Sequence, residues 1–198
     1  MAELTIDDMK INIPDGYREI KPLPEDPEGS VPLVMQTDNA LCFVLVHPTD
    51  MSGALPGDKK ELIEGIRQFM SPDQGIVAAE CGKDHVYSIV KTRKSPDGVQ
   101  YILTFQKFIG DRIVNVRGCF EEQGITGMRD NLIFGMCSSQ GLIGSEEDPM
   151  KGWASDPYDK DITAGFLMNL SEQEMFDDKF PGFPLTMCRE FIRKIISS

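Results

Sequence analysis

Residues 74–139 read QGIVAAECGKDHVYSIVKTRKSPDGVQYILTFQKFIGDRIVNVRGCFEEQGITGMRDNLIFGMCSS, and this stretch decides the fold. It contains four runs rich in Val, Ile, Tyr and Phe, at about 74–81, 85–94, 99–109 and 112–120. Residues that tolerate tight turns separate the runs, at Cys81-Gly82-Lys83-Asp84, Ser95-Pro96-Asp97-Gly98 and Gly110-Asp111. The pattern predicts an antiparallel β-meander followed by a helix at about 125–138.

The segments before the meander predict a further strand and a further helix. Residues 40–47 are almost continuously apolar, which is typical of a strand buried on both faces. Residues 58–70 carry apolar side chains at helical spacing after the acidic start Asp58. The meander strands are apolar on both phases of their alternation, so we expect helices 58–70 and 125–138 to cover the two faces of the sheet. The expected fold class is α/β (α+β): an antiparallel sheet sandwiched between helices as α/β/α.

The ends of the chain suggest further elements. Leu4 to Ile13 alternates around Asp7-Asp8 and predicts a short opening hairpin. We expect a main domain over residues 1–140, a connector over 141–161 where Gly, Ser, Pro and acidic residues dominate, and a C-terminal helical extension over 162–198. The extension is expected to pack on the main domain and to end in a helix.

Composition and charge restrict the class of protein. The chain has 198 residues with 40% hydrophobic residues, and its formal net charge is −12. This acidic balance argues against nucleic acid and anionic membranes as general partners, because phosphate groups bind clustered Lys and Arg. The acidic N-terminus does not resemble a secretory signal, and no apolar run is long enough to span a membrane. We therefore expect a cytoplasmic protein.

The five cysteines support the same expectation. They stand at positions 42, 81, 119, 137 and 188, without a C-x-x-C pair and in an odd number. This spacing argues against a disulfide framework and against a zinc ribbon. Four of them, Cys42, Cys81, Cys119 and Cys137, lie in or beside apolar runs, so we expect them to pack as small hydrophobic side chains.

Residues for catalysis or ligand binding are scarce. The only histidines are His47 and His85, and the phosphate-binding, dinucleotide-binding and nucleophile-elbow motifs are absent from the sequence. A Cys81–His85 dyad remains an alternative to an ordinary structural role for both side chains. The sequence predicts no catalytic residues, no cofactor and no metal site, and we expect a protein that is not an enzyme.

Two groups of residues are candidates for binding a partner. Residues 71–120 form the only net-positive part of the chain, with 7 basic and 5 acidic residues, and Lys91, Arg93 and Lys94 precede a turn within it. These cations indicate either a solvated hairpin edge or a binding patch. The second group is aromatic: Trp153, Phe180 and Phe183. They indicate a C-terminal segment that packs on its own sheet, on a second copy or on a foreign partner.

The order of elements resembles the superfamily that unites the photosystem II subunit PsbP with the Mog-type Ran-binding proteins and their bacterial relatives. The resemblance covers residues 9–140 and rests on the motif Ile11-Asn12-Ile13-Pro14-Asp15-Gly16-Tyr17, strand 40–47, helix 58–70, the meander and the helix near 125–138. It implies an antiparallel sheet between helices and a protein that binds other proteins. It assigns no functional residues, and the 58 residues after Gln140 extend beyond a minimal domain of this kind.

The sequence thus favours a non-enzymatic, cytoplasmic protein-binding module, such as an adaptor, a chaperone-like factor or a neutralising partner. The alternative is a small-molecule-binding protein or enzyme with a pocket between the sheet and the C-terminal extension, built from Trp153, Tyr158 and a meander cation such as Arg117. A homo-oligomer with a purely structural role is a third possibility.

Overall fold

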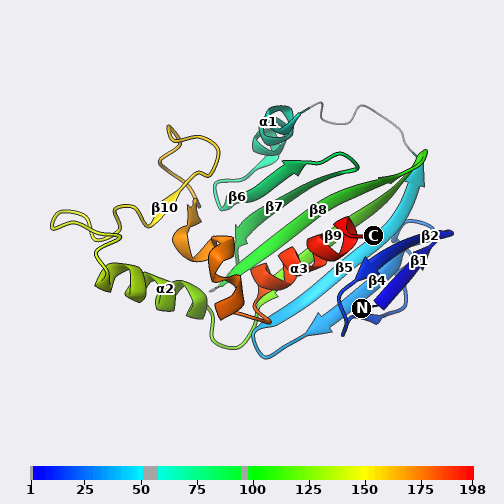
Figure 1. Cartoon of the computed structure of the whole chain (residues 1–198), viewed down its shortest axis with the longest axis horizontal. Coiled ribbons are helices and arrows are strands. Elements are labelled where there is room, and N and C mark those ends of the chain that lie inside the picture. The colour runs from blue at the N-terminus through cyan, green and yellow to red at the C-terminus, as the bar shows by residue number, and fades with distance from the viewer. Residues whose placement is uncertain (1, 51–57, 95–97) are drawn as a thin grey trace.

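A seven-stranded antiparallel sheet forms the centre of the protein, as the computed structural model shows for residues 2–50, 58–94 and 98–198 (Figure 1). The strands lie in the order β3 (Arg18–Glu19), β4 (Val31–Gln36), β5 (Ala40–Asp50), β9 (Arg112–Glu122), β8 (Val99–Ile109), β7 (His85–Arg93) and β6 (Gln74–Cys81). The predicted meander is therefore confirmed as β6 to β9. The predicted Ser95–Gly98 turn lies mostly outside the described residues, because only Gly98 among them is described.

The remaining elements surround this sheet. They are the hairpin β1 (Ala2–Ile6) and β2 (Met9–Ile13), the short pair β10 (Ala154–Ser155) and β11 (Met168–Asn169), the helices α1 (Lys59–Phe69), α2 (Met128–Ser139) and α3 (Pro184–Ile196), and the 3-10 helices η1 (Leu170–Glu172) and η2 (Glu174–Lys179). The predicted opening hairpin is confirmed, and Asp7 and Asp8 make its turn with positive φ angles. The chain is a mixed α and β protein built on an antiparallel sheet, as predicted.

One face of the sheet is covered by α3 and the β1–β2 hairpin (Figure 1). Pro184 occupies the first turn of α3, where its missing N–H costs no hydrogen bond, and apolar residues then recur at helical spacing. Phe191 and Ile195 of α3 are fully buried against strand residues such as Phe105 and Phe120. This contact forms the main hydrophobic core, so the last helix of the chain closes the central sheet.

The opposite face is covered at its β6 end by α1. Asp58 caps this helix, since its carboxylate accepts the N–H of Glu61 at 2.9 Å, and Ile63 packs against Ile76 and Ala79 of the sheet. Helices α1 and α3 therefore lie on opposite faces, which agrees with the predicted sandwich.

The expectation that the helix near 125–138 covers the sheet is wrong. Helix α2 instead forms a second small core with the chain that follows it. The buried residues of this core are Ile133 and Cys137 of α2, together with Ile143, Trp153, Phe176, Phe180 and Phe183. An apolar stripe shows that a helix face is buried but not what buries it. The terminal helix α3 occupies the sheet face, and α2 packs against η1 instead.

A buried ion pair connects the C-terminal segment to the sheet. Lys91 of β7 donates to Glu172 of η1 at 2.7 Å, and both side chains are 1% exposed. The other carboxylate oxygen of Glu172 accepts the hydroxyl of Tyr101, which stands opposite Lys91 on β8, and Glu172 also accepts the backbone N–H of Asn169. A buried charge needs such partners because its hydration has been lost.

Replacement of Lys91 by Met should destabilise the protein strongly. Glu172 would remain buried without its counter-charge, and we expect the free energy of unfolding to fall by about 3–5 kcal/mol. Urea denaturation of the Lys91→Met variant measures this loss.

Two further variants test whether the unpaired charge of Glu172 causes this loss of stability. The double variant Lys91→Met/Glu172→Gln should recover part of the lost stability, because it removes the unpaired charge. The exposed pair Lys10–Glu3, with 65% and 54% exposed side chains, provides the matched control: Lys10→Met should cost about 1 kcal/mol or less. Equal losses from Lys91→Met and Lys10→Met would contradict the role given to the buried pair.

The cysteines divide into two groups by burial. Cys42, Cys137 and Cys188 are buried, whereas Cys81 and Cys119 are half-buried, so the expected packing role fits Cys42 and Cys137 best. Burial raises the pKa of the Cys42 thiol to about 12. A thiol with this pKa contains very little of the reactive thiolate near neutral pH.

In the native protein, Cys42 should react with iodoacetamide far more slowly than an ordinary exposed thiol. At about pH 8 its thiolate fraction is roughly a thousandfold lower than that of a thiol with an unshifted pKa. Alkylation followed by peptide mass spectrometry measures each site, and the difference should vanish in denaturant. Rapid labelling of Cys42 in the folded protein would be inconsistent with its position in the core.

Candidate functional site

On the sheet face opposite α3, the strands in the middle of the sheet present side chains to solvent. We call this surface the open face and define it by residues that the strand register places on the same side: Val34, Leu41, Phe43, Leu45, Ile102, Thr104, Arg117 and Cys119. Val34, Phe43, Cys119 and Ile102 form a continuous apolar row across β4, β5, β9 and β8. Phe43 is 37% exposed, and its apolar row neighbours are half-buried.

The open face corrects the prediction that strand 40–47 is buried on both sides. Burial alternates along β5: Cys42, Val44 and Val46 are buried, whereas Leu41 and Leu45 are half-buried on the other side. The run of apolar residues suggested two covered faces. The structure shows that the side chains on the other side of β5 form part of an apolar surface instead.

Arg117 lies at the centre of the open face. It belongs to β9, the middle strand of the seven, and its neighbours across the register are Leu45 and Thr104. Arg117 is exposed and, within the described ranges, has no ion-pair partner. Arg and aromatic side chains are enriched in the centres of protein interfaces. The open face therefore combines an apolar row with an unpaired cation.

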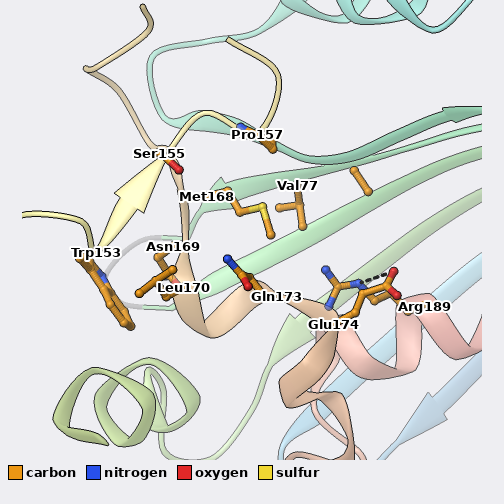
Figure 2. Close-up of a pocket in the computed structure, with 11 residues that line it drawn as sticks. Val77, Trp153, Ser155, Pro157, Met168, Asn169, Leu170, Gln173, Glu174 and Arg189 are labelled. Atoms are coloured by element: carbon orange, nitrogen blue, oxygen red, sulfur yellow. Dashed lines mark ion pairs between the residues drawn. The ribbon is translucent and has the colours of Figure 1, made fainter. Parts of the chain in front are cut away.

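On the sheet face that α3 covers, a pocket of about 330 Å³ lies between strand β6 and the C-terminal part of the chain from Trp153 onward (Figure 2). We call it the β6 pocket. Val77 of β6 and Met168 form part of its apolar wall, and Trp153 and Leu170 lie toward one end (Figure 2). Its volume is at the lower limit of small-molecule sites.

The opposite end of the β6 pocket is charged. Glu174 and Arg189 approach each other there, with 3.7 Å between the Glu174 carboxylate and Nε of Arg189 (Figure 2). The Arg189 side chain is 5% exposed, and its Nε makes no hydrogen bond within the described structure. These two residues were not identified as site residues from the sequence, since an Arg in an amphipathic helix ordinarily faces solvent.

Four of the six candidate partner-binding residues are buried. Lys91 forms the ion pair with Glu172, and Trp153 packs edge to face on Phe134 at 5.0 Å between ring centroids. Phe180 and Phe183 pack on each other at 5.2 Å in the second core. Their side chains serve internal contacts, so they do not offer a docking surface. Lys91 also does not belong to a solvated hairpin edge, because its position in the strand alternation places its side chain on the sheet face that α3 covers.

The other two candidates are at the surface. Arg93 lies over the ring of Phe166, 4.6 Å from its centroid, and 4.0 Å from Asp73. Lys94 pairs with Glu121 at 2.5 Å. Both cations already have partners on the same chain, which leaves Arg117 as a better candidate for contact with another molecule.

The structure separates the three residues of the alternative pocket. Trp153 lines the β6 pocket, whereas Tyr158 lies beside β6, where its hydroxyl accepts the N–H of Ala79 at 2.7 Å. Arg117 lies on the open face instead. Tyr158 also borders a second hollow of about 480 Å³ beside α1, together with Lys59 and Arg67.

The titratable groups near His85 make contacts within the chain. His85 is buried, stacks on Phe105 at 5.9 Å and contacts Asp84 at 3.0 Å, and the hydrogen bond from His85 lowers the pKa of Asp84. In the described ranges, His, Cys, Asp and Glu side chains do not gather into a group of three or more that could hold a metal ion. Nor does any helix among those residues have the length and apolar character to cross a membrane.

Comparisons with known proteins yield structural neighbours only. No protein-family model matches the chain, and no curated protein matches its sequence. The Ran-binding protein Mog1p of Saccharomyces cerevisiae is similar over 70% of this chain and 82% of its own, with 11% identity and a TM-score of 0.42. A mutant of protein Mog1 is similar over 98% of this chain and 93% of its own, with 10% identity and a TM-score of 0.42. Similarity at this level transfers no ligand or partner to this chain.

Proposed function

We propose that this protein is a non-enzymatic, cytoplasmic protein-binding module that binds its partner through the open face. The observation that carries the proposal is the apolar row Val34–Phe43–Cys119–Ile102, which the sheet presents at its surface beside Arg117, a cation without an ion-pair partner among the described residues. The five free thiols fit a reducing compartment.

The chemistry of the open face defines the partner. Exposed apolar side chains on neighbouring strands gain free energy when a second surface excludes water from them. Phe43 provides an aromatic group with few rotatable bonds, and Arg117 provides a guanidinium that binds a carboxylate in a planar geometry. We infer a partner with an apolar patch and an acidic side chain opposite Arg117.

The position of Arg117 argues against a second copy of the chain on this face. A two-fold axis through the middle of the sheet would bring two Arg117 guanidinium groups together, and like charges in an interface are unfavourable. A foreign partner with a complementary charge avoids this repulsion. A homo-oligomer through the open face is an outcome that would contradict the proposal.

Replacement of Phe43 by Glu should abolish partner binding without unfolding the protein. The side chain is 37% exposed, so the fold tolerates the change, while a buried carboxylate in the complex would weaken binding at least about thirtyfold. Affinity capture from native lysate with the full chain, followed by mass spectrometry, identifies the retained protein. Binding of that protein to the purified variants then gives the affinities.

Phe69 offers the control, because it is 88% exposed and belongs to α1 at the β6 end of the sheet, outside the residues that define the open face. The Phe69→Glu variant should retain the same protein, and Arg117→Glu should lose it. Retention of the same proteins by Phe43→Glu and Phe69→Glu, or of none by the original chain, would contradict the proposed function.

A further inference from the structure

We propose that the β6 pocket is a separate binding site for a carboxylate attached to an apolar group, with Arg189 as the recognising residue. We also propose that Glu174 occupies the carboxylate position in the free protein and is displaced by the ligand. The site is independent of the open face, since Arg117 and Phe43 lie on the other side of the sheet.

Of the three guanidinium nitrogens of Arg189, Nε is the one without a hydrogen-bond partner among the described residues, and it is therefore the donor that a ligand can use. One terminal nitrogen donates to the Asp177 carboxylate at 3.0 Å, and the other donates to the backbone carbonyl of Glu172 at 2.5 Å. These two bonds hold the planar group in place. The Nε–H is buried and makes no hydrogen bond within the described residues, which is costly for a charged donor.

The charge of Arg189 is only partly balanced by its internal partner. Asp177 contacts three guanidinium groups, those of Arg129 and Arg189 at 3.0 Å each and that of Arg193 at 3.6 Å. A single carboxylate divided among three cations leaves positive charge on the pocket side of Arg189. An anion at this position is therefore electrostatically favoured.

Glu174 shows which kind of anion fits. Its carboxylate lies 3.7 Å from Nε of Arg189, close enough for an ion pair but too far for a hydrogen bond (Figure 2). Its side chain is 67% exposed, so it is held weakly and can move into solvent. A ligand carboxylate that takes its place would form the hydrogen bond that Glu174 does not form.

The rest of the β6 pocket fits an apolar group. Val77, Met168 and Leu170 contribute aliphatic surface, and the indole of Trp153 lies at the far end (Figure 2). A ligand with its carboxylate at Arg189 would extend along this wall. The carboxylate can belong to a free small acid or to the C-terminus of a peptide, and paired probes distinguish these sources.

Trp153 allows binding to be measured directly, because it is the only tryptophan of the chain and lines the pocket. Hexanoate and hexanamide form one pair of probes, and a short peptide ending in Leu, with a free or amidated C-terminus, forms the other. We expect the acid of at least one pair to change the Trp153 emission and to bind at least about tenfold more tightly than its amide. A response to hexanoate indicates a free acid, and a response confined to the peptide acid indicates a chain terminus.

Two variants test the residues. Glu174→Gln removes the competing charge and should increase the affinity for the acid about fivefold, the scale of a partly exposed ion pair. Ser155→Phe places a bulky side chain at the exposed mouth of the pocket and should abolish the response, while Arg189 keeps its contacts. Glu147→Gln, at an exposed position outside the pocket lining, should leave the affinity unchanged.

Several outcomes would overturn the inference. Equal affinity for an acid and its amide would remove the role of Arg189 as a carboxylate donor. A weaker acid affinity in Glu174→Gln would show that Glu174 assists binding, and unchanged binding in Ser155→Phe would place the probe elsewhere. The absence of a response to both acids would refute the site, whatever the open face binds.

Discussion

The buried ion pair between Lys91 and Glu172 fixes where the C-terminal part of the chain attaches to the sheet. It joins strand β7 to the segment before α3, and Tyr101 and the backbone of Asn169 complete the coordination of the Glu172 carboxylate. Charges buried to this extent tolerate little displacement, because neither has access to water. The pair therefore holds η1 at one position on the sheet, and the chain that follows η1 enters α3 from there.

This attachment gives the two sheet faces different roles. Helix α3 covers one face, and Lys107 of β8 supports its end by donating to the carbonyls of Ile195 and Ile196. A cation at the C-terminus of a helix is favoured by the helix dipole. The opposite face keeps an apolar row and Arg117 at the surface. Both candidate sites follow from this arrangement, since the β6 pocket forms where the attached segment meets the edge strand.

Local patterns were sufficient to predict most of the elements. The meander strands, helix α1 with its Asp58 cap and the final helix were each visible in short runs of sequence, because turn residues and apolar spacing act over a few positions. The candidate site residues were harder to predict. In the sequence, Lys91 resembles a solvated cation, whereas its strand phase places it beside Tyr101. Phe180 and Phe183 likewise resemble a docking surface, whereas α2 covers them in the structure.

The mixed α and β class, the antiparallel meander and the acidic character of the chain can be derived from its residues alone. Which helix covers which face, which meander cations are buried and where Arg189 meets Glu174 become visible only in the folded chain. The physical reason is range: propensity and periodicity depend on neighbours in the chain, whereas burial and ion pairing depend on residues far apart. Lys91 and Glu172 are separated by 81 positions, and their contact exists only when the C-terminal segment lies on the sheet.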